Sequence, residues 1–97
     1  SANGQNIYPE EIEAAVNNQP YIIESVVVNR GARLVALVYA DAEKAKAEGT
    51  DLEAYKTVIM AEVNKSMPSY SKINIVEYMD QPFEKTPKMS IKRFMYK

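Results

Sequence analysis

The 97-residue sequence contains no cysteine and no histidine. Without cysteine the chain cannot form disulfides, a thiolate nucleophile or cysteine-bound zinc. Without histidine it lacks the usual general base at neutral pH, Ser-His-Asp catalysis and most transition-metal sites. The longest apolar run, from Leu34 to Ala40, is far shorter than the ~20 residues that span a bilayer. Since no signal peptide or glycine-rich phosphate loop is visible either, we expect no metal site, no transmembrane segment and no enzyme complete in itself.

Positive charge is scarce except at the end of the chain. The net charge of -1 argues against nucleic-acid binding, because phosphate contacts need a cationic face. Residues 84–97, which we call the C-terminal segment, contain four lysines and one arginine against one acid. Two interpretations stay open: a solvated tail, or a cationic surface that meets an anion. Ile91 and Phe94 alternate with the basic residues, so part of the segment can dock on an apolar surface.

Hydrophobic periodicity and breaker residues divide the chain into helices and strands. Pro9 followed by two acids is typical of a helix start. Asp41 can cap a helix that Gly49 ends, and Thr50-x-x-Glu53 has the spacing of a capping box. Two β-branched runs around an Arg-Gly-Ala turn predict an antiparallel hairpin. The predicted elements are a helix from residue 9 to about 17, strands over 21–29 and 34–40, helices over 42–48 and about 51–66, and a strand over 73–78.

The order of these elements predicts the α+β class, with helices packed on one face of a small, mainly antiparallel three-stranded sheet. In the long helix, apolar residues at spacings of three and four predict a buried stripe: Leu52, Tyr55, Ile59 and Val63. We interpret residues 1–97 as one domain. Because the chain begins with Ser rather than Met, we expect residues 1–3 to be a cloning remnant or the end of a hinge, and the whole to come from a longer polypeptide.

Three stretches become specific when they are taken together: GQNIYPEEIE (4–13), VNKSMPSYSKI (63–73) and EKTPKMSIKRF (84–94). The first resembles the stretch that follows the hinge in adenylate-forming acyl-CoA synthetases, with the pattern Gly-x-Asn-Ile-x-Pro-x-Glu-[Ile/Val]-Glu. The second is similar to that family's helix end, Pro-x-Tyr and following strand. The third resembles its closing motif, a Lys-Thr-Pro followed by a basic segment. The resemblance covers essentially the whole chain in order, and it looks most like the long-chain fatty acid CoA ligase branch.

This resemblance implies a mobile C-terminal lid domain of a larger ligase. The family makes an acyl-adenylate from ATP and a carboxylate, then transfers the acyl group to the thiol of CoA. A large N-terminal adenylation domain, absent from this chain, holds ATP, Mg²⁺ and the acyl group, while the lid swings between two poses and delivers a lysine in one of them. The implied partners are that domain and, for the parent enzyme, fatty acid, ATP and CoA. The 97-residue chain alone is expected to bind no cofactor and to be inactive.

The closing motif departs from the family pattern at the residues closest to catalysis. The common form, Thr-Pro-x-Gly-Lys-x-x-Arg, places its glycine at Met89, its lysine at Ser90 and its arginine at Arg93. No residue therefore inherits the catalytic lysine directly. Lys88 and Lys92 are the candidates to replace it, with Lys88 slightly ahead because a turn there could aim it inward. A lysine from elsewhere, adenylation without one and an impaired copy stay open. Arg93 is expected to be an anchor or a phosphate-facing residue.

Gly4 matches the glycine after the hinge, which in the family lies near the path of the pantetheine thiol, so the resemblance implies a CoA contact there. A hypothesis from another class also stays open: a non-catalytic interaction module whose basic C-terminal segment binds an anionic partner. That hypothesis explains the uneven charge but not the motif over residues 4–13. We expect a cytoplasmic protein, and peripheral association with a membrane is left open.

Overall fold

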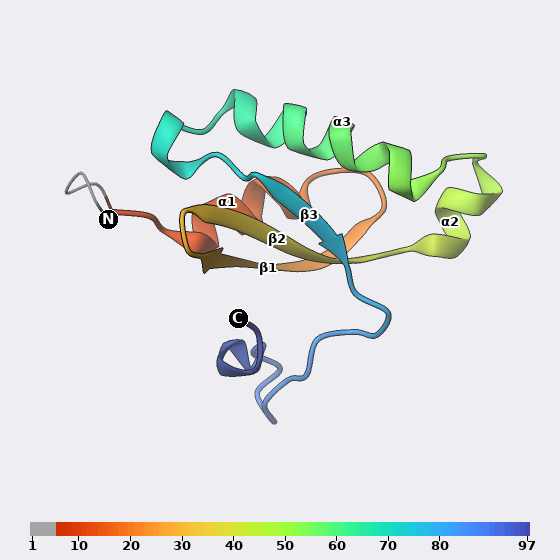
Figure 1. The fold of residues 1–97 in the computed structure, drawn as a ribbon. Helices are drawn as coiled ribbons and strands as arrows, with labels where there is room; N and C mark the ends of the chain where they lie inside the picture. Colours follow the sequence, from red (N-terminus) through yellow and green to blue (C-terminus); the bar gives the residue numbers. More distant parts are fainter. Residues whose placement is uncertain (1–5) are drawn as a thin grey trace.

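A three-stranded mixed sheet with strand order β1-β2-β3 forms the centre of the fold (Figure 1). The computed structural model describes residues 6–97. The elements in chain order are α1 (Pro9–Asn17), β1 (Ile22–Arg30), β2 (Arg33–Ala40), α2 (Ala42–Ala47), α3 (Leu52–Lys65), η1 (Ser69–Ser71), β3 (Ile75–Tyr78) and η2 (Arg93–Met95), where η denotes a 3₁₀ turn. The predicted α+β class and the predicted order of the main elements are confirmed. Over residues 6–97, no helix combines the length and apolar character that crossing a bilayer requires.

The third strand pairs differently from the first two. β1 and β2 form the predicted antiparallel hairpin, closed at Gly31 with a left-handed φ of 65°. β3 adds to the other edge of β2 and runs parallel to it, with Val35 opposite Ile75. The sheet is therefore mixed, with a longer antiparallel pairing between β1 and β2 and a shorter parallel pairing between β2 and β3. The reason is the long connection through α2 and α3, since a parallel neighbour requires a crossover of a dozen or more residues.

The helix ends follow the predicted chemistry with one exception. Asp41 caps α2 by accepting the Lys44 N–H at 3.0 Å, and Gly49 follows that helix with a φ of 73°. At α3, however, the cap is Asp51, whose Oδ1 accepts the Glu53 N–H at 3.0 Å. The capping box predicted from Thr50 is therefore wrong. Its hydroxyl lies 2.9 Å from the Tyr21 hydroxyl, which leaves the next residue to cap the helix.

One face of the sheet is covered by α1 and α3, and we call it the helix-covered face. Aliphatic side chains from all three strands and both helices form its core: Ile12, Val16, Val27, Leu34, Ala36, Val38, Ile59, Val63, Ile73 and Val76. Ile59 and Val63 belong to the predicted stripe of α3 and are fully buried. Side chains alternate along a strand, so the neighbours of these strand residues point to the opposite face.

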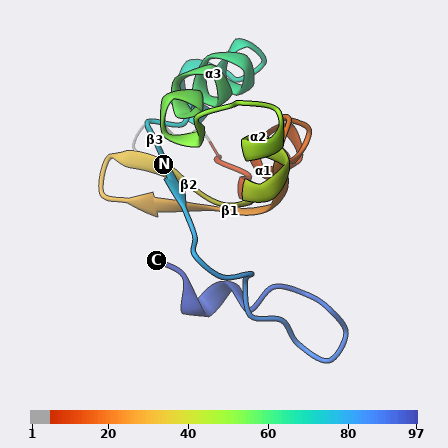
Figure 2. The same cartoon turned by 90° about the vertical axis from the view of Figure 1, so that its right-hand side faces the viewer.

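The opposite face is covered by Phe83 and the C-terminal segment, and we call it the segment-covered face (Figure 2). Phe83 is 3% exposed and joins a second buried cluster with Val26, Val35 and Leu37. Its ring meets the ring of Tyr96 edge-on, with centroids 4.9 Å apart. Since both faces are buried, the strands have continuous apolar runs, and the basic end of the chain is part of the folded domain rather than a solvated tail.

A cationic hairpin as the candidate functional site

The basic motif folds into a small hairpin over residues 84–92, which we call the cationic hairpin. The Thr86 N–H donates to the Ser90 carbonyl and the Met89 N–H donates to the Thr86 carbonyl, each at 2.8 Å. These bonds enclose a three-residue loop, a type that commonly ends in a residue with left-handed φ, and Met89 has a φ of 67°. Glycine is favoured at such a position, so the family's Thr-Pro-x-Gly matches the loop. Met89 adopts the conformation without being glycine.

The two arms of the hairpin fix which side chains face outward. Lys85 and Ile91 form an antiparallel bridge. Ile91 packs on the segment-covered face, and the Lys85 Nζ lies 2.8 Å from the Glu24 carboxylate on β1. Because side chains alternate along an extended arm, Ser90 and Lys92 lie on the side opposite Ile91. Lys88 lies in the loop, where alternation does not apply, and it is exposed.

An ion pair joins the first motif of the sequence to the last. Arg93 donates through both terminal nitrogens to the Glu13 carboxylate on α1, with Nη1 2.9 Å from Oε2. Glu13 is 5% exposed, and its Oε2 also accepts the Val27 N–H of β1 at 2.7 Å. Hydrogen bonding to Glu13 raises the pKa of Arg93 above its ordinary value, so the guanidinium stays charged. This pair ties the end of the C-terminal segment to α1.

Further polar contacts fasten the ends of the C-terminal segment. Glu24 accepts the Phe83 N–H at 2.9 Å as well as pairing with Lys85. Arg30 donates to the Lys97 carbonyl at 2.8 Å and pairs with Glu77 at 2.7 Å. Three lysines of the segment form no ion pair with any residue in the described part of the chain: Lys88, Lys92 and Lys97. The fold thus neutralises Lys85 and Arg93 internally and leaves the other cations available to a partner.

Sequence reasoning missed Glu13 and Glu24 as the residues that hold the hairpin. A signal for Glu13 was present, because it lies on the face of α1 that also carries the buried Ile12 and Val16. An acid within an apolar helical stripe needs a partner when it is buried. No comparable signal marks Glu24. Gly4, the predicted CoA contact, lies outside the described residues.

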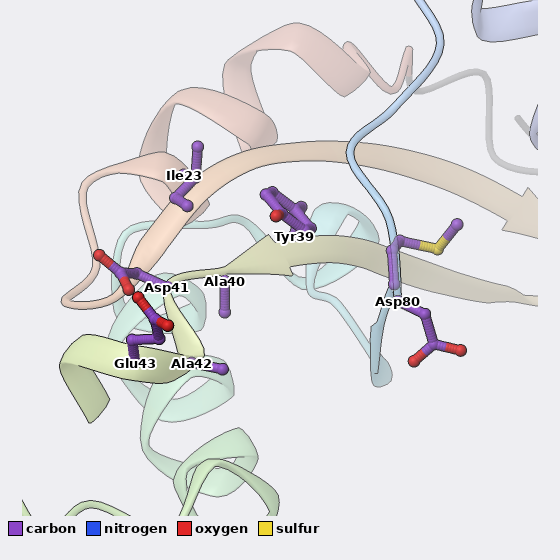
Figure 3. Close-up of a pocket in the computed structure, with 8 residues that line it drawn as sticks. Ile23, Tyr39, Ala40, Asp41, Ala42, Glu43 and Asp80 are labelled. Atoms are coloured by element: carbon purple, nitrogen blue, oxygen red, sulfur yellow. The ribbon is translucent and has the colours of Figure 1, made fainter. Parts of the chain in front are cut away.

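A separate hollow of about 360 Å³ lies where β2 leads into α2 (Figure 3). Its lining includes three carboxylates, Asp41, Glu43 and Asp80, and no basic side chain. Such a lining does not suit an anionic nucleotide. Within residues 6–97 no three potential ligands from His, Cys, Asp and Glu gather as a metal site. The cationic hairpin is therefore the candidate functional site.

Comparison with known proteins places this hairpin in a family. The family model described as "AMP-binding enzyme C-terminal domain" matches residues 1–96. The chain belongs to this family. The match confirms the family inferred from the three motifs. It does not separate the long-chain fatty acid branch from other acyl and aryl branches. None of the curated proteins matches the chain.

Solved structures share the fold of this AMP-binding enzyme C-terminal domain. The adenylation domain of a carboxylate reductase from Mycobacterium chelonae has a TM-score of 0.77 at 20% identity, over 97% of this chain and 16% of that one. A benzoate CoA ligase from Burkholderia xenovorans LB400 has a TM-score of 0.73 at 20% identity, over 95% and 18%. A Mycobacterium tuberculosis fatty acyl CoA synthetase has a TM-score of 0.69 at 21% identity, over 95% and 17%. Other similar structures hold ATP or anthranoyl-AMP. At these identities the likeness is one of fold, and the chain spans under a fifth of each of those proteins.

Proposed function

We propose that this domain is the C-terminal lid of an ATP-dependent long-chain acyl-CoA synthetase, and that its cationic hairpin closes over the acyl-adenylate site. The observation that carries the proposal is how the hairpin is held. Glu24 pairs with Lys85 of the hairpin, and Glu13 pairs with Arg93 immediately after it. Lys88 and Lys92 have no ion-pair partner in the described chain. A hairpin that ion pairs hold in place, and whose other lysines are unpaired, suits an electrostatic role toward a separate anionic site.

The chemistry of adenylation suits a hairpin that presents unpaired lysines. A triphosphate and a carboxylate approach one another, so negative charge on the transferring groups must be stabilised. An ammonium group brought to those oxygens supplies that stabilisation, and removing a comparable group typically costs on the order of 10²-fold in rate. We propose that Lys88 or Lys92 takes the place of the motif lysine, because Ser90 cannot carry a charge. The lid's two poses would let this cation leave before the thiol step.

The first experiment separates the lid from the enzyme. Incubated with ATP, palmitate and CoA, the 97-residue chain alone should form no acyl-CoA, since the proposed N-terminal adenylation domain supplies the nucleotide and acyl sites. Adding that domain, or using the full-length parent, should give activity. Robust acyl-CoA formation by the chain alone would contradict the proposal.

The second experiment assigns the lysine in the full-length parent. Lys88→Ala or Lys92→Ala should slow ATP–pyrophosphate exchange more than thioester formation from preformed adenylate, whereas Lys72→Ala, at an exposed lysine outside the hairpin, serves as the matched control. Ser90→Lys restores the motif lysine and should raise the exchange rate. Equal slowing of both half-reactions would exclude a lysine that acts in one pose.

The acyl specificity and the cofactors are tested separately. The SIKRF ending supports the long-chain branch, a similar structure with bound ATP supports use of ATP by the parent, and a similar protein named as a CoA ligase supports use of CoA. Mg²⁺ is proposed from the family resemblance alone. Palmitate should be activated in preference to benzoate. Preference for benzoate would overturn the long-chain part of the proposal and leave the lid intact. A CoA contact at Gly4 predicts a slower thiol step in Gly4→Leu with unchanged adenylation.

The same unpaired lysines also support the second hypothesis, a module that binds an anionic partner without catalysis. It predicts salt-dependent binding of the 97-residue chain to vesicles that contain anionic phospholipid or to RNA. We favour the lid because it also accounts for the fold and for the motif over residues 4–13. Binding that Lys88→Ala and Lys92→Ala abolish, with no activity in the parent, would reverse that preference.

A further inference from the structure

Met89 combines three properties that rarely occur together. It lies at the tip of the cationic hairpin, its φ of 67° is left-handed, and the residue is 72% exposed. The family's glycine occupies this position in the common motif, and glycine would adopt the conformation at no steric cost. A large apolar residue here has two costs in the isolated domain. A non-glycine residue is strained at this φ, and its apolar side chain is exposed to water.

The other left-handed residues in the described chain show how such a conformation is ordinarily accommodated: Gly31, Gly49 and Tyr21. Two of them are glycine. Tyr21 is compensated, because its hydroxyl donates to Glu48 at 2.7 Å and its ring packs edge-on against Tyr55 with centroids 5.4 Å apart. Met89 belongs to neither hydrophobic cluster of the domain. Met89 differs from Tyr21 in that it is mostly exposed, whereas Tyr21 is partly buried.

We propose that Met89 is an apolar contact of the closed lid, seated against an apolar wall of the N-terminal domain beside the adenylate. This inference rests on the proposed function. The hairpin tip extends away from the rest of the domain in Figure 2, so it is placed to meet a facing surface first. Lys88, next to Met89 at the tip, is exposed and has no ion-pair partner in the described chain. An anionic centre with an apolar border complements that pair, and methionine adapts well to irregular apolar surfaces.

The oxidation rate of Met89 measures whether this contact forms, and it does not depend on enzyme activity. In the 97-residue chain, hydrogen peroxide should oxidise Met89 quickly because its thioether is exposed. In the full-length parent with ATP and palmitate, the oxidation rate of Met89 should fall about tenfold, because burial keeps the reagent from the sulfur. Each rate is divided by the oxidation rate of a free methionine peptide in the same sample. An equal rate in the two samples would overturn the inference. If wild-type parent activates no fatty acid, the proposed function fails, and the oxidation rate still shows whether Met89 is covered.

Substitutions separate the contact from the backbone strain. Met89→Gly relieves the strain, so the unfolding midpoint of the 97-residue chain should stay level or rise. The same change should slow adenylation by the parent about tenfold, the loss expected for one buried apolar side chain. Met89→Gln keeps the side-chain length and should slow adenylation similarly. Met95→Gln, at a half-exposed position outside the hairpin, is the matched control and should have no effect. Wild-type adenylation by Met89→Gln would overturn the inference.

Discussion

The two faces of the sheet are buried by different means. The helix-covered face packs aliphatic side chains under two regular helices. The segment-covered face is covered by chain without regular secondary structure, in which the Phe83 and Tyr96 rings pack together. The carboxylates of Glu13 and Glu24 hold this chain through ion pairs with Arg93 and Lys85. Apolar packing under helices fills space and stabilises the fold. Ion pairs with defined geometry also fix the orientation of the segment on the sheet.

The largest effect should come from breaking the helix-covered face. Ile59→Ala removes a fully buried side chain between α3 and the sheet. We expect it to lower the free energy of unfolding by about 2–5 kcal/mol and to destabilise both faces together. Urea denaturation measures the change. Val58→Ala, on the neighbouring 43% exposed position, is the control and should stay within about 0.5 kcal/mol. Similar losses for both variants would show that the helix does not bury Ile59.

The ion pair should be the sharpest way to release the C-terminal segment alone. Glu13→Ala leaves the Val27 N–H without its acceptor. It also leaves Arg93 with only Glu10 as an ion-pair partner in the described chain, and that carboxylate lies 3.9 Å away. The expected cost is about 1–3 kcal/mol, together with lost hydrogen-exchange protection in residues 84–97. Glu13→Gln keeps an acceptor for Val27 and removes the charge, so its effect should be smaller. Unchanged protection of the segment in Glu13→Ala would mean that apolar packing alone holds it.

A smaller effect should distinguish the paired from the unpaired lysines of the hairpin. The Lys85 side chain is 25% exposed and its partner Glu24 is 16% exposed, so Lys85→Ala should cost about 0.5–1 kcal/mol. Lys88→Ala should leave the unfolding free energy unchanged, since Lys88 has no ion-pair partner in the described chain. Raising the salt concentration should narrow the difference between the variants. An equal loss of unfolding free energy in Lys85→Ala and Lys88→Ala would refute the distinction between paired and unpaired lysines.

A further effect arises only at alkaline pH and belongs to the helix-covered face. Burial raises the pKa of Tyr78 to about 12, and its hydroxyl donates to the Leu52 carbonyl at 2.6 Å. The unfolded chain loses this proton near pH 10. Stabilisation by the neutral Tyr78 is therefore complete below pH 10 and is lost as the pH rises toward 12. Urea midpoints should fall across that window, and less steeply in Tyr78→Phe.

Local signals predicted most of the secondary structure, because they act within one turn of chain. Proline at a helix start, an aspartate cap and glycines with positive φ each work through neighbouring backbone groups. The cap of α3 shows the limit of such signals. Thr50 and Asp51 are both good caps, and the choice fell to Asp51 since Tyr21, 29 residues before Thr50, engages the threonine hydroxyl.

The sequence by itself determined the helices, the β1–β2 hairpin and the family motifs. It also determined that the chain carries no histidine or cysteine chemistry. Only the tertiary structure decided that β3 runs parallel to β2, that the basic end covers a face of the sheet, and which cations remain unpaired. Glu13 and Arg93 lie 80 residues apart, and their meeting depends on how the whole chain closes. Periodicity and capping are properties of adjacent residues, whereas the charge left for a partner depends on contacts between distant parts of the chain.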